Sequence, residues 1–464
     1  MDCVETIRVG VKGYERGRKV QKILIANRGE IALRIIKTCQ RMGIETIAIY
    51  SEADKEMPFV KAATKAICVG EPHVSKSYLQ IDKILQIAQK EQVDAIHPGY
   101  GFLSENAAFA QQAKNAGIIF IGPEPKTIEL MGDKIASRLT MEKAGVPVVP
   151  GSRHGLKTIE EACYLAETIG YPIMLKASGG GGGIGMVLCE NEQALVKFYD
   201  STKKRAMTYF GSDEVFIEKY IADSRHIEIQ VFGDQYGNMV HLFERDCSIQ
   251  RRHQKVVEES PSPFLSDKVR QKMFEIAIKA AHAVQYTNAG TIEFIVDEEE
   301  NFYFLEMNTR LQVEHPVTEM ITGLDLVKWQ ILVARGEKLP LMQDEIVSNG
   351  NAVEFRLYAE DPIRFLPSPG KITALKWSEK EGTRIDSGYV EGGTVTPFYD
   401  PMIAKCIFYG DSREKALAEA AKFFKDIKIE GIKTNVPLFL NILKSESFQK
   451  GEYTTNFLNT NYVK

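Results

Sequence analysis

The sequence predicts an α/β protein of two or three domains whose N-terminal domain is doubly wound. At 464 residues the chain is too long for one compact core. From residue 22 onward, apolar runs of strand length alternate with stretches of helical period, which is typical of a parallel sheet covered by helices on both faces. Around residue 300, two runs of β-branched and aromatic residues flank an acidic turn and predict an antiparallel hairpin.

The first domain is assigned to residues 22–135. No Gly-x-Gly-x-x-Gly follows its first strand, so we assign it no nicotinamide cofactor. The loop HPGYGFLSEN follows a strand, where open α/β sheets bind ligands, although Gly99 and Gly101 fit plain turn residues equally well. The elements expected in this domain are strands at 23–26, 46–50, 95–97 and 118–121, and helices at 31–42, at 78–92 and after Ser104.

A run of five glycines at residues 179–183 marks the second region of interest. A domain boundary is expected between residues 122 and 151, where prolines frame a helical stretch. Predicted strands at 171–177 and 185–189 flank the glycines, which favours a phosphate-covering loop over a flexible linker. No Gly-Lys-Ser/Thr follows, so this is not a Walker loop; the nearest lysine, Lys176, precedes the glycines.

Two further stretches are dense in polar side chains. Strand alternation at residues 226–231 places His226, Glu228 and Gln230 on one face. A basic cluster follows within residues 244–255, and its commoner explanation is an exposed charged face. Beside the glycine run we favour anion binding. The cluster contains Arg245, Arg251, Arg252, His253 and Lys255.

The predicted hairpin at residues 291–314 brings two carboxylates together. If its turn lies near residues 299 and 300, paired residues sum to 599, and Glu293 faces Glu306. Together with Asn308 they form an all-oxygen site suited to Mg²⁺ or Mn²⁺; a solvated edge hairpin is the alternative. As long as the chain stays extended, one face carries Glu306, Asn308, Arg310, Gln312 and Glu314.

The C-terminal part returns to mixed elements. A helix is expected at 324–335, a strand from residue 352 with Arg356 on the same face as Glu354 and Tyr358, and short strands up to residue 407. A final helical region is expected from residue 413 to about 447.

Composition limits the class of protein. The net charge of -4 gives no general attraction for nucleic acid. The seven cysteines are odd in number and scattered, which favours reduced thiols in the cytoplasm. No apolar run is long enough to span a membrane. Residues 1–21 lack the apolar stretch of a signal peptide, and we expect a short exposed extension there.

Several long motifs, in order along the chain, resemble biotin carboxylase, an ATP-grasp family. They are NRGEIA at residue 27, HPGYGFLSEN at 97, KASGGGGG at 176, ERDCSIQRRHQK at 244, EMNTRLQVEHPVTE at 306 and YDPMIAK at 399. The likeness covers residues 22–458. It implies a Rossmann-like, pre-ATP-grasp N-terminal domain at 22–135, an ATP-grasp domain at 136–335 with a mobile lid at about 151–223, and a C-terminal α+β biotin carboxylase domain at 350–458.

In that family ATP phosphorylates bicarbonate to carboxyphosphate, which yields carbon dioxide that is captured by N1′ of biotin. The chain has no Met-Lys-Met, so the resemblance implies that biotin arrives on a separate biotin carboxyl carrier protein. It also implies a carboxyltransferase partner, as in acetyl-CoA carboxylase, and a homodimer.

The resemblance also assigns roles to matching residues. The nucleotide would contact Lys134, Lys176, Gly182, Gly183, Glu218, Lys219, Tyr220, Ile221, His226, Gln250 and His253. The metal ligands would be Glu293, Glu306 and Asn308. Bicarbonate and biotin would meet Lys255, Arg310, Gln312, Val313 and Tyr100, with Glu314 as the base and Arg356 stabilising the biotin enolate.

One departure from the family pattern lies beside the glycine run. Ile184 and Val187 stand where basic residues are usual, which predicts weaker ATP binding or altered lid closure. Two rival interpretations follow from the same motifs: another ATP-grasp ligase, such as a carbamoyl-phosphate or purine-pathway enzyme, and a non-catalytic nucleotide-binding regulator.

Overall fold

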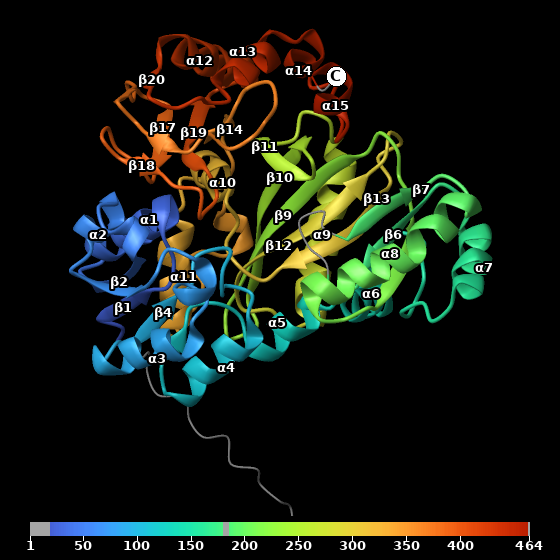
Figure 1. Ribbon diagram of the computed structural model, residues 1–464, viewed down its shortest axis with the longest axis horizontal. Helices are drawn as coiled ribbons and strands as arrows, with labels where there is room; N and C mark the ends of the chain where they lie inside the picture. The colour runs from blue at the N-terminus through green and yellow to red at the C-terminus, as the bar shows by residue number, and fades with distance from the viewer. Residues whose placement is uncertain (1–18, 180–184, 463–464) are drawn as a thin grey trace, which may run out of the picture.

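A computed structural model of the chain describes residues 19–179 and 185–462. A small N-terminal domain and a helix-covered flap lie on opposite sides of one large sheet, and a cap of C-terminal helices covers one end of that sheet (Figure 1). None of the described helices is long and apolar enough to cross a membrane.

The N-terminal sheet is parallel and has the strand order β3-β2-β1-β4-β5, which confirms the doubly wound prediction. Within β1, Ile23 and Ile25 pack with α1, whereas Leu24 packs with α3 and α4 on the other face. The sequence analysis missed β3 because most of its side chains are exposed. The elements are β1 (Lys22–Ile25), α1 (Gly29–Arg41), β2 (Glu45–Ser51), η1 (Glu52–Asp54), α2 (Pro58–Ala62), β3 (Lys65–Gly70), η2 (Val74–Lys76), α3 (Ile81–Lys90), β4 (Ala95–His97), α4 (Ala107–Asn115) and β5 (Ile119–Phe120).

The helical stretch expected after residue 122 is two helices, α5 (Pro125–Gly132) and α6 (Lys134–Lys143). Asp133 separates them. Its Oδ1 accepts hydrogen bonds of 2.9 Å from the backbone N–H groups of Ile135 and Ala136, which caps α6. Lys134 therefore stands in the first turn of α6, at the edge of the large sheet.

The flap is a three-stranded antiparallel sheet with its own hydrophobic core. Its middle strand carries Lys176, which pairs in register with Met186. The predicted glycine loop connects these two strands, and its residues 180–184, including Gly182, Gly183 and Ile184, lie outside the described residues. The flap contains α7 (Ile159–Ile169), β6 (Ile173–Ala177), β7 (Met186–Cys189), α8 (Glu192–Phe210) and β8 (Val215–Lys219).

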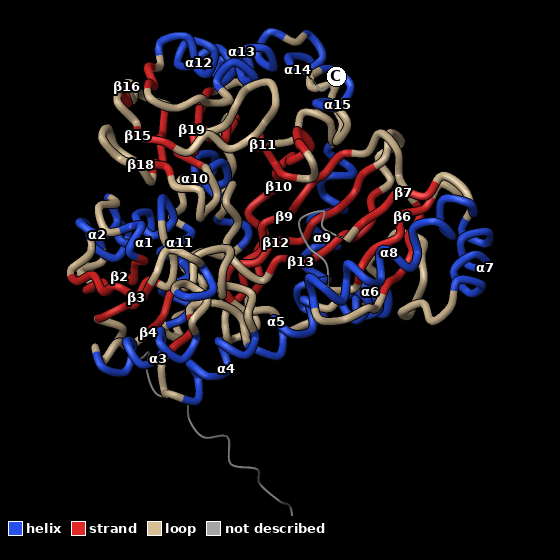
Figure 2. The backbone as a smooth tube through the Cα atoms, in the orientation of Figure 1, coloured by secondary structure: helices blue, strands red, loops and turns tan. Residues whose placement is uncertain are grey.

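The largest sheet has eight antiparallel strands in the order β13-β12-β9-β10-β11-β14-β19-β17. Its strands run through the centre of the molecule between helical layers (Figure 2). The predicted hairpin and the C-terminal strands thus belong to one sheet. The strands are β9 (Arg225–Gly233), β10 (Met239–Arg251), β11 (Gln254–Ser260), β12 (Asn288–Val296), β13 (Phe302–Asn308), β14 (Asn351–Tyr358), β17 (Thr383–Ser387) and β19 (Met402–Gly410).

Alternation along these strands separates core from site. In β9, Ile227 and Ile229 pack under α9 (Asp267–Ala283), which leaves His226, Glu228 and Gln230 on the opposite face, as predicted. In β14, Phe355 and Leu357 pack with helices α12 and α13, which leaves Glu354, Arg356 and Tyr358 on the other side.

Two predictions are wrong in detail. β13 ends at Asn308 and Glu314 is the N-cap of α10 (His315–Thr322), so the chain does not stay extended to Glu314. The final helical region is interrupted by strand β20, which pairs with β16. The remaining elements are α11 (Leu326–Ala334), η3 (Gln343–Glu345), β15 (Gly370–Lys371), β16 (Ala374–Lys376), β18 (Thr394–Val395), α12 (Arg413–Asp426), β20 (Lys428–Glu430), α13 (Val436–Lys444), α14 (Glu446–Lys450) and α15 (Phe457–Asn461).

Candidate active site

The hairpin register agrees with the prediction where it matters. Thr291 pairs with Asn308, and Glu293 faces Glu306 across β12 and β13. Beyond Glu293 the register shifts by one residue, because an irregularity in the ladder places Phe294 opposite Phe304. Glu293 is buried, whereas Glu306 is partly exposed.

Lys255 occupies the centre of the site, between three carboxylates. Its Nζ donates to Glu228 Oε2 at 2.5 Å, to Glu293 Oε1 at 2.9 Å and to Glu314 Oε1 at 2.7 Å. Burial alone would lower the pKa of Lys255, but the three carboxylates raise it well above its usual value. Lys255 is therefore a permanent cation at the meeting point of β9, β11, β12 and the start of α10.

A second cation, Arg245, lies beneath the first and is fully buried. Its Nε donates to Glu228 Oε1 at 2.5 Å, and its Nη1 donates to Gln230 Oε1 at 2.8 Å. Glu228 thus links Arg245 to Lys255. The basic cluster therefore divides between a buried brace and groups that reach the site, and the role of Glu228 was signalled in the sequence only by the alternation of β9.

Glu314 is buried and ionised. Its Oε1 accepts from Lys255, and its Oε2 accepts from Arg356 Nη2 at 2.9 Å. Burial would raise its pKa, but Lys255 and Arg356 hold the pKa of this carboxyl well below its usual range. The structure therefore presents a carboxylate base bracketed by two cations.

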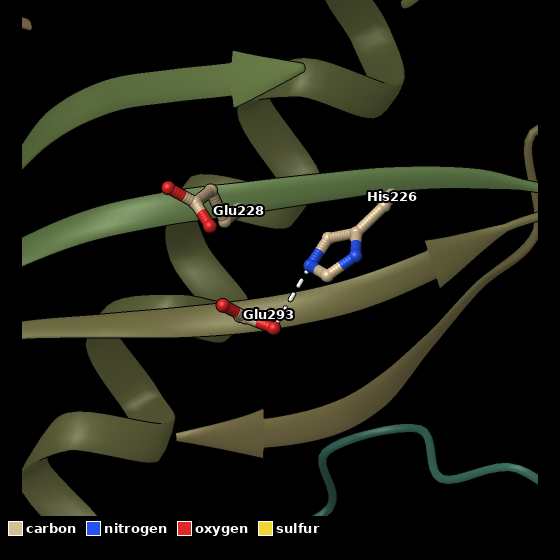
Figure 3. A group of neighbouring side chains, drawn as sticks. All are labelled: His226, Glu228 and Glu293. Carbon is tan, nitrogen blue, oxygen red and sulfur yellow. Dashed lines mark ion pairs between the residues drawn. The ribbon is translucent and has the colours of Figure 1, made fainter. Parts of the chain in front are cut away.

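The residues predicted to hold a metal form one hydrogen-bonded group. Glu293 Oε2 lies 2.8 Å from His226 Nε2 (Figure 3), and Glu293 Oε1 accepts from Asn308 Nδ2 at 2.8 Å and from Gln312 Nε2 at 3.0 Å. Glu306 lies 3.5 Å from Lys134 Nζ. Two facing carboxylates beside an amide are a donor set that fits Mg²⁺ or Mn²⁺. An ion there would compete with Lys255 and His226 for Glu293.

Arg310 ties the hairpin to the N-terminal domain. Its Nε donates to Glu105 Oε2 at 2.8 Å, and its Nη1 and Nη2 donate to Gln312 Oε1 at 2.8 Å and Asn308 Oδ1 at 3.0 Å. Glu105 belongs to the loop at residues 97–106. The sequence analysis singled out that loop for ligand binding but did not identify Glu105 as the anchor of Arg310.

The predicted nucleotide residues of the flap face the large sheet from β6 and β8. Lys176 Nζ lies 2.5 Å from Glu218 Oε2, so these two side chains form an ion pair on the flap sheet. Lys219 Nζ instead donates to the carbonyls of Gly170 and Tyr171, at 2.9 and 3.0 Å. The side chain of Lys219 thus braces the flap, and Tyr220 and Ile221 follow it at the end of β8.

On the large sheet, His226 and Gln250 form a hydrogen-bonded pair, with 2.8 Å between Nδ1 and Nε2. His253 lies in the two-residue turn between β10 and β11. Arg252 and His253 have φ angles of 50° and 64°, a left-handed conformation that usually selects asparagine or glycine. Burial, with Lys176 nearby, lowers the pKa of His253, so its imidazole is neutral at pH 7.

We expect His253→Gly to increase stability and to weaken nucleotide binding. Relief of the left-handed backbone should raise the free energy of unfolding by about 0.5–1 kcal/mol, whereas loss of the imidazole removes a predicted ATP contact. Chemical denaturation and an ATP titration measure the two effects. Arg252→Gly is the matched control, because it relieves the same turn without touching a predicted ATP residue. Unchanged ATP affinity in His253→Gly would remove His253 from the nucleotide site.

The residues predicted to meet bicarbonate and biotin converge on one cavity of about 390 Å³ between the N-terminal domain and β14. Tyr100, Val313 and Arg356 line it. Tyr100 donates its hydroxyl to Glu30, and Lys405 donates to the Val313 carbonyl at 2.9 Å. Glu314 lies directly behind Arg356, so the base and the cavity share one arginine.

A sheet carrying facing carboxylates, buried lysines and a separate glycine-loop flap defines an ATP-grasp enzyme, and sequence comparison agrees. Residues 133–342 match the family model described as carbamoyl-phosphate synthase L chain, ATP binding domain. Residues 19–128 and 354–460 match the N-terminal and C-terminal domains of biotin carboxylase. The chain belongs to the biotin carboxylase family.

Individual relatives span nearly the whole chain. Biotin carboxylase 2 of Bacillus subtilis is 58% identical over 437 residues, covering 94% of this chain and 98% of the relative. The biotin carboxylase–β,γ-ATP complex from Campylobacter jejuni superposes with a TM-score of 0.94 at 47% identity, covering 95% and 99% of the two chains. The Hydrogenobacter thermophilus 2-oxoglutarate carboxylase biotin carboxylase domain dimer, in complex with MgADP, ADP and bicarbonate, gives 0.93 at 47% identity, covering 96% and 98%.

Proposed function

We propose that this chain carboxylates biotin at N1′, with ATP and bicarbonate, by way of carboxyphosphate. The observation that carries the proposal is Glu314, an ionised and buried base held between Lys255 and Arg356. Lys255 connects it to the metal carboxylate Glu293, and Arg356 connects it to the cavity. The base therefore stands between the place for phosphoryl transfer and the place for carboxylation.

Bicarbonate must lose its proton to attack the γ-phosphate, and Glu314 is the group that takes it. Its low pKa makes it a weak base on its own. A bicarbonate clamped by Lys255, Arg310, Gln312 and the backbone of Val313 divides the same cations with Glu314, which raises the proton affinity of Glu314 in the complex. Clamping also fixes the attacking oxygen in line with the phosphate.

The phosphoryl group is positioned by groups on both sides of the site. Lys134, Lys176 and neutral His253 would contact the nucleotide, together with His226, Gln250, the Glu218–Ile221 strand end, Gly182 and Gly183. Glu293, Glu306 and Asn308 would hold the divalent ion, which neutralises charge on the transferred group. Closure of a lid at about 151–223 would exclude water from carboxyphosphate.

Biotin would enter the cavity beside Tyr100, where the Arg356 guanidinium stabilises the negative charge that develops on the ureido oxygen. Because the chain has no Met-Lys-Met, we propose that biotin arrives on a carrier protein and that a carboxyltransferase takes the carboxyl group onward. We further propose that the enzyme works as a homodimer in the cytoplasm.

The direct test is transfer of isotopically labelled bicarbonate to biotin by the purified chain with ATP and Mg²⁺. Label should appear in free biotin, and faster in a biotinylated carrier protein. Formation of labelled carbamoyl phosphate from ammonia, with no label in biotin, would favour a different ATP-grasp ligase.

A further inference from the structure

Two glutamates behind Arg356 have no assigned role. Glu258 on β11 and Glu354 on β14 stand directly opposite each other in the antiparallel ladder, and both are fully buried. Their contacts differ. Glu258 Oε1 lies 2.6 Å from Arg356 Nη2, whereas the two oxygens of Glu354 have no hydrogen-bond partner in the part of the chain that the structure describes.

The Arg356 guanidinium is therefore held from two sides through one nitrogen. Nη2 lies 2.6 Å from Glu258 and 2.9 Å from Glu314. In the proposed cycle Glu314 takes the proton of bicarbonate and loses its charge. From that moment the ion pair with Glu314 is weakened, and Glu258 is the carboxylate that still holds Arg356.

We propose that Glu258 is a positioning residue that keeps Arg356 directed into the biotin cavity while Glu314 carries a proton. The inference rests on the proposed function, because it assigns Glu258 to the biotin half of the reaction. Glu354 serves a different purpose. Two ionised carboxylates directly opposite each other would repel, and a protonated Glu354 lets Glu258 stay charged.

The surroundings of the pair support this division. Burial raises the pKa of Glu258 to about 7, with Arg356 pulling it down, and burial raises the pKa of Glu354 well above its usual value. Charged and titratable groups face the pair from all neighbouring elements. They are Arg356 on β14, Lys255 on β11, Arg245 and Cys247 on β10, Lys405 on β19 and Glu314 at the start of α10.

The sign of the pH dependence follows. Above about pH 7 Glu258 is charged and grips Arg356; below that pH it takes a proton and releases Arg356. Biotin-stimulated turnover should therefore have an acidic limb near pH 7. Bicarbonate-dependent ATP hydrolysis without biotin, which does not use Arg356 in this role, should lack that limb.

The matched pair Glu258→Gln and Glu354→Gln tests the proposal, because the two positions share burial, strand pairing and chemistry. In Glu258→Gln we expect biotin-stimulated kcat to fall on the order of 100-fold, the scale of a catalytic group misplaced by about 1 Å, with KM for biotin changed far less. The acidic limb should disappear. Bicarbonate-dependent ATP hydrolysis without biotin should change by less than about fivefold, well within the span expected for misplacement. Glu354→Gln should keep the wild-type kcat and pH profile.

Wild-type kcat and an intact acidic limb in Glu258→Gln would overturn the proposal, and so would an equal loss in both variants. Melting temperatures of both variants separate misfolding from misplacement. Failure of the proposed function itself looks different, because the wild-type chain would then show no stimulation by biotin at all.

Discussion

Replacing Glu314 by glutamine is expected to reduce bicarbonate-dependent ATP hydrolysis by about 100- to 10,000-fold, the usual contribution of a general base. Glutamine keeps the size of the side chain but accepts no proton. ATP affinity should stay near the wild-type value, because Glu314 contacts Lys255 and Arg356 and not the predicted nucleotide residues. Steady-state hydrolysis at saturating bicarbonate, with an ATP titration, measures both.

The matched control is Glu319→Gln, on the same helix α10. Glu319 is also buried and paired with arginine, but its partners are Arg34 and Arg384, away from Lys255. This variant should lose stability and keep its turnover per folded molecule. Unchanged bicarbonate-dependent turnover in Glu314→Gln would rule out Glu314 as the base.

Lys255→Met should cause the largest loss of stability, about 3–5 kcal/mol, because breaking a buried ion pair leaves its partners uncompensated. Here the carboxylates of Glu228, Glu293 and Glu314 would lose their shared cation. The deficit should shrink as pH falls, because protonated carboxyls need no cation, and burial already raises the pKa of Glu228. Denaturant unfolding at pH 8 and pH 6 measures it.

Lys134→Met provides the comparison for that experiment. Lys134 is partly exposed and lies 3.5 Å from Glu306, so its removal should cost well under about 1 kcal/mol. Its expected effect is on ATP affinity instead. Equal stability of the two variants would show that Lys255 does not hold the three carboxylates together.

Local patterns predicted most of the site. The facing of Glu293 and Glu306 followed from a short hairpin, because a turn and two-residue periodicity determine register without any distant contact. The face of His226, Glu228 and Gln230, and that of Glu354, Arg356 and Tyr358, followed from alternation in the same way.

Contacts between distant segments were not predictable from such patterns. The bond from Arg310 to Glu105 joins residues 205 positions apart, and the Glu258–Glu354 pairing joins strands about 100 residues apart in sequence. Strand order in an eight-stranded sheet depends on which edges meet after the chain has folded, and neither edge carries a local mark. The early end of β13 was missed because residues 309–314 keep an apolar alternation while they turn into α10.

The most direct test of the account is ATP hydrolysis by the purified chain with Mg²⁺, in four reactions that include or omit bicarbonate and free biotin. We expect hydrolysis to require bicarbonate and to rise when biotin is added, since Glu314 activates the first substrate and Arg356 the second. Hydrolysis that is indifferent to both additions would contradict the account, because nothing then connects the nucleotide site to Glu314 or to the cavity.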